Sequence, residues 1–229
     1  MIVVVGSLGW RSAPPAAPAG RACGIALAAV ARGAQAELVG RVGEDATGEA
    51  LLLALAQAGV GHAAVLRDAA RPTLLVAPAA AAPDQDDEAS PFEDPSPAPA
   101  RTATSLAGAA GPRLEGADVD LGIRYLAPSG VLVVTEDVPS DVLAAAVEAG
   151  QFAGMRLVAL VAPGGLASRA LPAGLPDDAT VLAAPDQDDA GAFDALVGAY
   201  AAALDGGADP AAAFAVAQGA TGWEPATPD

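Results

Sequence analysis

The sequence contains no lysine and no asparagine, a single cysteine, a single histidine and very few aromatic residues. Every basic residue is therefore arginine, which excludes any mechanism that depends on a lysine side chain. The lone Cys23 excludes an internal disulfide and a four-cysteine zinc site, and we expect it to be an inert core residue. The lone His62 lies in a Gly-rich turn, so neither a catalytic triad nor a histidine-based metal site is expected.

Charge and hydropathy restrict the partners. The formal net charge of −17 argues against nucleic acid, because such a surface repels phosphate. No run approaches the roughly 20 apolar residues of a membrane helix, so no membrane partner is expected. Residues Met1–Val5 lack a basic leader and run into glycine, which indicates a strand and not a signal peptide. We therefore expect a cytoplasmic protein.

Apolar runs and Ala-rich helical stretches alternate along the chain. Strands are predicted at 1–6, 36–43, 65–78, 130–135, 155–163 and 179–185, and helices at 20–32, 45–59, 139–150, 190–207 and 209–220. This alternation predicts an α/β fold, a three-layer αβα sandwich with a mostly parallel central sheet. We expect one domain over 1–229, with a flexible loop rich in Ala, Pro and Asp at about 79–112.

Two stretches carry a family signature. Residues Gly33–Val60 place Gly40, Gly43, Asp45 and Gly48 on the spacing of an N-terminal signature, and the chain from 188 onward resembles a D-T-x-G-A-G-D segment that opens a long helix. In both respects the sequence resembles the ribokinase-like carbohydrate kinases, the PfkB family. The resemblance implies the ribokinase-like fold, with the lid over the substrate reduced or absent here, and a possible homodimer.

The second signature implies the catalytic residues. Backbone N–H groups at a helix start are unpaired and attract anions, and an aspartate one turn in can accept the proton of an attacking hydroxyl. By the resemblance, the backbone amides of Gly191, Ala192, Phe193 and Asp194 form an anion hole, and the Asp194 carboxylate is the general base. Phe193 departs from the family, which has glycine there. In the alternative interpretation, Asp194 is simply a charge that is favourable in the first turn of a helix.

The substrate-binding end departs further from the family pattern. Gly9 and Arg11 stand where the family has Asn and Asp, and the next helix opens with Gly20 and, in place of an asparagine, Gly24. These are the candidate substrate-binding residues. Since a polyol needs fixed acceptors, we expect that the substrate is not held as ribose or fructose would be.

The heptapeptide AAPDQDD occurs twice, at Ala81–Asp87 and Ala183–Asp189. The second copy resembles the family's P-N-x-x-E motif, which implies Asp186 and Asp189 as Mg²⁺ ligands. In the family this motif and the glycine-aspartate motif lie far apart, whereas here they overlap, so several strands of the nucleotide pocket are expected to be missing. The first copy is interpreted as a solvated acidic loop. A metal shared between the two copies is the alternative.

Three functional hypotheses follow. The first is an ATP-dependent phosphotransferase that resembles PfkB sugar and nucleoside kinases. It uses ATP and Mg²⁺ and phosphorylates a hydroxyl of its partner, a small-molecule substrate. The second is a catalytically inactive ribokinase-fold protein that binds a small ligand or a partner. The third, a Rossmann-type dinucleotide enzyme, is disfavoured because "GSLG" lacks the G-x-G-x-x-G spacing after the first strand.

Overall fold

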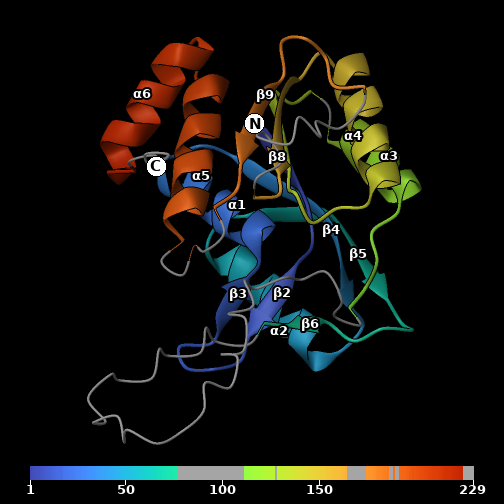
Figure 1. Ribbon diagram of the computed structural model, residues 1–229. Coiled ribbons are helices and arrows are strands. Elements are labelled where there is room, and N and C mark those ends of the chain that lie inside the picture. The colour runs from blue at the N-terminus through green and yellow to red at the C-terminus, as the bar shows by residue number, and fades with distance from the viewer. Residues whose placement is uncertain (77–110, 127, 164–173, 186–187, 189–190, 224–229) are drawn as a thin grey trace, which may run out of the picture.

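The computed structural model describes residues 1–76, 111–126, 128–163, 174–185, 188 and 191–223. Its centre is a six-stranded parallel sheet in the order β5-β4-β1-β7-β8-β9, covered by helices on both faces (Figure 1). The strands are β1 (Ile2–Val5), β4 (Ala36–Gly43), β5 (Gly61–Asp68), β7 (Val131–Val134), β8 (Arg156–Val161) and β9 (Thr180–Ala183). The predicted α/β sandwich with a mostly parallel sheet is confirmed.

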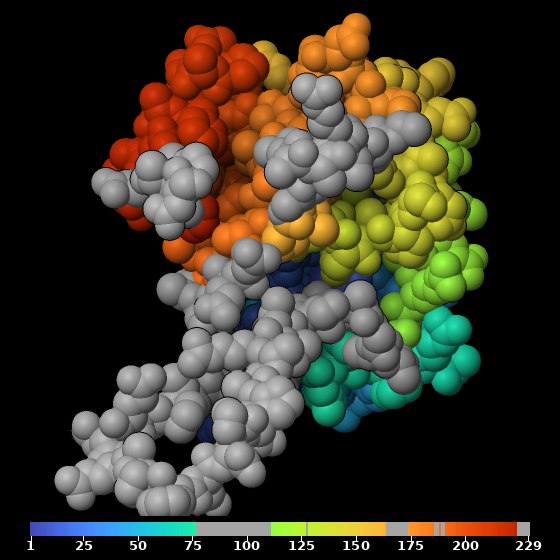
Figure 2. Space-filling view, in the orientation of Figure 1, coloured from blue at the N-terminus to red at the C-terminus, as the bar shows by residue number. Residues whose placement is uncertain are grey.

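The helices form two groups. On one face lie α1 (Arg21–Ala31), α2 (Ala46–Gln57), α5 (Ala192–Asp205) and α6 (Pro210–Thr221), and on the other lie α3 (Gly116–Tyr125) and α4 (Ser140–Phe152). Figure 2 shows α5 and α6, in orange and red, on one side of the molecule and α3 and α4, in green and yellow, on the other. Each group buries its apolar side against the sheet.

The central strand β1 explains why both faces are covered. All its residues are buried: Ile2 and Val4 pack into the core beneath α1 and α5, while Val3 and Val5 pack into the core beneath α3 and α4. Successive side chains of a strand point to opposite faces, so a continuous apolar run needs a helix layer on each.

Helices α1 and α5 lie against each other at Gly198. A Cβ atom there would be 2.6 Å from the Ala28 Cβ and 2.7 Å from the Ile25 carbonyl oxygen, so only glycine fits without a shift. This close packing brings the first turns of the two helices together, at the edge of the sheet where the parallel strands end.

A second, small sheet lies beyond this edge (Figure 1). It has the order β3-β2-β6 and consists of β2 (Gly9–Arg11), β3 (Ala17–Ala19) and β6 (Leu74–Leu75). Its strands are of three, three and two residues, which agrees with the expectation of a reduced lid.

Two predictions about elements were wrong. No helix was predicted between residues 60 and 138, yet α3 forms there and begins with a capping box between Glu115 and Asp118. Gly150 was predicted to follow α4 but lies inside it, because a Cβ there would be only 2.7 Å from the Leu132 Cδ2. The helix ends instead before Gly154, whose φ is 69°.

The predicted loop at about 79–112 lies outside the described residues except for residues 111 and 112. Within the parts of the chain that the structure describes, no helix combines the length and apolarity needed to cross a membrane.

Candidate functional site

A cluster of charged side chains occupies the edge where the parallel strands end. Glu136 is the second residue after β7. Arg21 and Asp194 lie in the first turns of α1 and α5, and Asp188 lies in the connection from β9 to α5. In open α/β sheets, the carboxyl ends of the strands are the usual position for ligand binding.

Arg21 links two of these carboxylates. Its Nη1 donates to the Asp194 Oδ1 at 2.7 Å, and its Nε donates to the Glu136 Oε1 at 2.5 Å. The same Nη1 lies 3.5 Å from the Asp188 Oδ2. All three ion pairs are largely buried, so solvent screens them less than it screens surface pairs.

Asp188 accepts the first amides of α5. The Phe193 N–H donates to its Oδ1 at 3.1 Å and the Asp194 N–H donates to its Oδ2 at 3.3 Å. Two of the amides proposed for an anion hole thus already have an anionic partner from the chain itself. Gly191, with φ 67°, is the N-cap and provides no side chain.

Burial dominates the titration of Asp194. It raises the pKa of this carboxyl to about 7, Arg21 opposes the rise, and the nearby Asp188 carboxylate adds to it. A carboxylate whose pKa lies near neutral pH has the proton affinity expected of a general base.

The glycine at position 24 makes room for this carboxylate. A Cβ on Gly24 would lie 2.1 Å from the Asp194 Oδ2, so any side chain would displace it. Gly24 and Arg21 are one helical turn apart on α1 and therefore face the same way.

Phe193 lies in the core. Its ring is buried and packs against Trp223, with centroids 5.5 Å apart, and the Arg21 guanidinium lies 5.1 Å from the ring centroid. A phenylalanine is accommodated here because its side chain points away from the amides that donate to Asp188.

The predicted substrate-binding residues separate into two groups. Gly20 is the N-cap of α1 with φ 92°, beside Gly24 and the charged cluster. Gly9 and Arg11 belong to β2 in the small sheet. A Cβ on Gly9 would lie 2.9 Å from the Val76 Cγ2, and Arg11 is exposed and forms no ion pair with another described residue.

The predicted metal ligands Asp186 and Asp189 lie outside the described residues. Among the residues that the structure does describe, no group of three or more His, Cys, Asp or Glu side chains is placed to hold a metal ion. The Oε2 atom of Glu136 and the Oδ2 atom of the neighbouring Asp137 are buried and have no hydrogen-bond partner among the described residues. These are hard oxygen donors of the type that Mg²⁺ takes.

The N-terminal signature has a structural role. Asp45 caps α2 by accepting from the Gly48 N–H at 2.7 Å and also accepts from the Thr73 N–H at 2.7 Å. The Thr73 hydroxyl accepts from the Gly43 N–H at 2.9 Å. The backbone hydrogen bond from Gly48, followed by that from Thr73, lowers the pKa of Asp45. This network joins β4, α2 and the segment leading to β6.

Cys23 is fully buried, and its burial raises the pKa of the thiol to about 12. The thiolate is the reactive form of cysteine, so this residue is inert, as expected from the sequence.

Sequence reasoning missed Arg21 and Glu136, and it did not foresee that Asp188 would accept the α5 amides. A signal existed for Glu136, since "TED" follows a fully apolar strand and polar residues there face the ligand edge of a parallel sheet. No signal in the sequence places Arg21 between two carboxylates from distant segments.

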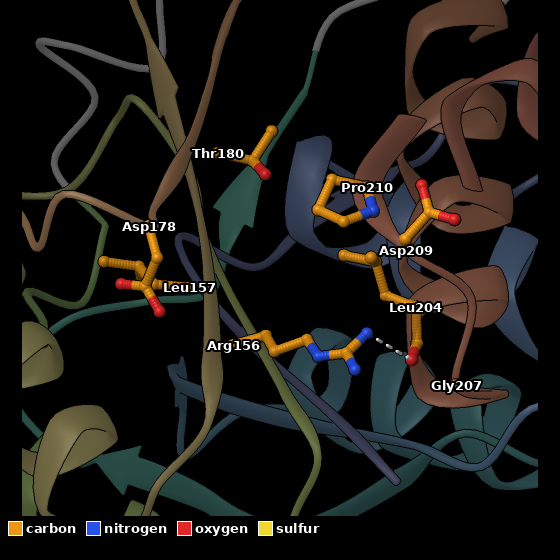
Figure 3. A pocket seen from close by; sticks show the side chains of 8 residues that line it. All are labelled: Arg156, Leu157, Asp178, Thr180, Leu204, Gly207, Asp209 and Pro210. Carbon is orange, nitrogen blue, oxygen red and sulfur yellow. Dashed lines mark hydrogen bonds between the residues drawn. The ribbon is translucent and has the colours of Figure 1, made fainter. Parts of the chain in front are cut away.

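A separate cavity of about 320 Å³ lies at the opposite end of the sheet, where β8 and β9 begin (Figure 3). Arg156 projects toward it and donates from Nη1 to the Leu204 carbonyl oxygen at 3.2 Å. Thr180 and Asp209 also line this cavity. It contains none of the residues of the charged cluster.

Comparison with known proteins identifies the fold. No protein-family model and no curated protein matches the sequence. Among solved structures, Arabidopsis thaliana ribokinase in complex with ribose and ATP is similar, with a TM-score of 0.61, 18% identity and coverage of 96% of this chain and 91% of that one. An Escherichia coli protein provisionally classed as ribokinase II, in complex with ATP and Mg²⁺, has a TM-score of 0.64 and 14% identity, over 94% of this chain and 89% of that one.

A PfkB protein from Polaromonas sp. JS666 has a TM-score of 0.62 and 17% identity, over 94% of this chain and 92% of that one. These identities are low, while the alignments extend over nearly the whole of each chain. This chain has the ribokinase-like fold of the PfkB carbohydrate kinases.

Proposed function

We propose that this protein is an ATP-dependent phosphotransferase that phosphorylates a hydroxyl group of a small molecule, with Asp194 as the general base. The observation that supports this most directly is the position of Asp194. It lies in the first turn of α5, at the carboxyl edge of the sheet, with a pKa of about 7. The similar solved structures that contain ATP support a reaction that uses ATP.

The chemistry follows from the position and charge of Asp194. Its carboxylate accepts the proton as the O–H bond of the acceptor breaks and the acceptor oxygen bonds to the transferred phosphorus. With a pKa near 7, a large share of the carboxylate is ionised at neutral pH and still has a useful proton affinity. Arg21 fixes the carboxylate by its 2.7 Å hydrogen bond.

The described residues fit a phosphate group on one condition. Asp188 must leave the amides of Phe193 and Asp194, since a phosphate and a carboxylate cannot accept the same N–H groups. For Mg²⁺, Glu136 and Asp137 supply buried oxygens with no partner, and Asp186 and Asp189 are proposed as ligands by family resemblance. When bound, Mg²⁺ would neutralise charge on the transferred group.

The acceptor is proposed to be a small hydroxylated molecule that is not recognised as ribose or fructose is. Arg11 stands where the resemblance leads one to expect an acceptor carboxylate, and it belongs to the small sheet. Several expectations remain predictions from the sequence. They are the absence of a nucleic-acid or membrane partner, the cytoplasmic location and the possible homodimer.

The proposal is tested by a coupled assay of ADP release with ATP–Mg²⁺ over a panel of sugars and nucleosides, together with Asp194→Asn. We expect this variant to lose at least about 100-fold in kcat, because a positioned general base contributes that much or more. Asp209→Asn is the matched control, since Asp209 caps α6 away from the cluster and its loss should leave turnover unchanged. Wild-type protein that neither turns over nor binds ATP–Mg²⁺ in calorimetry would exclude the proposal.

A second candidate function is favoured by Asp188. Asp188 already occupies the α5 amides and Asp194 is already paired with Arg21. This arrangement is the one expected of a non-catalytic protein that binds a small ligand or a partner. The two candidates differ in the effect of Asp194→Asn on any detected turnover, because only the phosphotransferase requires a large loss.

A further inference from the structure

We propose that Arg21 is the positioning residue of this site: by binding Asp194 and Glu136 at once, it sets the orientation and the charge of the proposed base. This inference rests on the proposed function, in which Asp194 takes a proton. Arg21 itself need not touch the substrate, since it acts through the carboxylate that it holds.

The geometry of the guanidinium supports this role. Its Nη1 donates to Asp194 at 2.7 Å while its Nε donates to Glu136 at 2.5 Å, so two donors of one rigid plane join residues from two segments. The side chains of Arg21, Glu136 and Asp194 are each exposed by 17% of their area. A carboxylate held this way loses most of its freedom to change rotamer.

Two neighbouring residues, Phe193 and Gly24, help to set the positions of Arg21 and Asp194. The Phe193 ring lies beneath the guanidinium, with 5.1 Å from its Cζ to the ring centroid, a cation–π arrangement that favours the charged group there. Gly24, one turn along α1 from Arg21, leaves the space that the Asp194 Oδ2 occupies. Helix α1 therefore supplies both the donor and the room for the same carboxylate.

Because the other charges around Asp194 are negative, the charge of Asp194 depends on Arg21. Glu136 after β7 and Asp188 before α5 both repel a negative charge on Asp194, while Arg21 is the cation that pairs with it among the described residues. The groups that face this pair are Glu136, Asp137, Asp188 and the Cys23 thiol. Without Arg21, burial and these like charges would act on Asp194 unopposed.

The test is a titration of Asp194 by NMR, with ¹³C-labelled aspartate side chains and Asp194→Asn to assign its signal. We expect the Asp194 midpoint in Arg21→Gln to rise by one pH unit or more, roughly a tenfold gain in proton affinity. In the turnover assay, the acidic limb of the kcat/KM profile should move up by the same amount. Arg41→Gln is the matched control, because Arg41 pairs with Asp118 by bonds of 2.7 and 2.9 Å away from the cluster.

An unchanged Asp194 midpoint in folded Arg21→Gln would overturn the inference. Should that variant fail to fold, Arg21→Lys takes its place: one ammonium group lacks the fork that serves both carboxylates, so its midpoint should also rise, and no rise overturns the inference. The titration needs no turnover. An inactive wild-type protein would thus count against the proposed function alone, while a raised midpoint in the variant would still support the positioning role.

Discussion

Asp188 controls what the start of α5 can bind. It is the acceptor for the Phe193 and Asp194 amides, and its removal would leave two N–H groups at the positive end of a helix dipole without a partner. In the proposed anion hole, this carboxylate occupies the amides that a phosphate would need.

We therefore predict that Asp188→Ala binds inorganic phosphate at least about tenfold more tightly than the wild type, because charge-assisted bonds to amides favour an anion there. Isothermal titration calorimetry with phosphate measures the difference. Asp209→Ala is the control, since it likewise frees two amides, those of Ala211 and Ala212, at the start of a helix outside the cluster. Equal phosphate affinity in Asp188→Ala and wild-type protein would contradict the prediction.

Some individual residues could be predicted from the sequence and others could not. The burial of Cys23 follows from composition alone, because a free cysteine packs as a small hydrophobe. The proposed role of Asp194 was expected from the resemblance of its segment to the second signature of the PfkB family. The partnership of Arg21 with Glu136 could not be predicted, since the two residues are 115 positions apart and no local pattern links them.

Helices α1 and α5 bring the charged cluster together through their contact at Gly198. The two first turns meet only because the helix axes approach closely, and this approach depends on the missing side chain at that position. Both helices were predicted from Ala-rich periodicity, whereas their contact required the three-dimensional structure.

We predict that Gly198→Ala lowers the free energy of unfolding by roughly 1–3 kcal/mol, because the added methyl group collides with the backbone of α1. Gly219→Ala in α6 is the matched control. A Cβ there meets nothing within 4 Å, so this change should stabilise by up to about 1 kcal/mol through helix propensity. Urea denaturation measures both, and a Gly198→Ala protein as stable as the wild type would show that the helices can separate at no cost.

Helices α3 and α4 show where hydrophobic periodicity does not predict the observed structure. Gly150 resembles a helix stop in the sequence, yet it lies in the last turn of α4, where a glycine is needed because Leu132 of the sheet leaves no space for a side chain. Helix α3 has few apolar residues and follows a long polar stretch, so its pattern is weak. Its formation depends on burial of Val119 and Ile123 against the sheet.

The buried charges of the cluster affect the stability of the whole protein. Asp194 has a pKa of about 7 in the folded chain against an ordinary value of 3.8, so the folded state binds its proton more tightly than the unfolded state does. The stabilisation from this protonation is complete at low pH and is lost as the pH rises through 7.

We predict that the free energy of unfolding of the wild type falls between about pH 5 and 7 by up to roughly 1 kcal/mol per pH unit from this group. Asp194→Asn should be flatter over the same interval, because its amide does not titrate. The lowered pKa of Asp45 acts in the opposite direction but at more acidic pH, outside this window. Parallel curves for the two proteins in chemical denaturation would refute the assignment.

The sequence by itself determined the order of the six central strands and of every helix except α3, and the apolar character of both sheet faces. The reason is that hydrophobic periodicity and helix-capping residues act over a few neighbouring positions. Only the tertiary structure decided that Arg21, Glu136, Asp188 and Asp194 meet, and that Asp188 takes the amides of α5. The physical reason is that burial and charge pairing depend on distances between segments, which the packing of α1 on α5 and the carboxyl edge of the sheet establish.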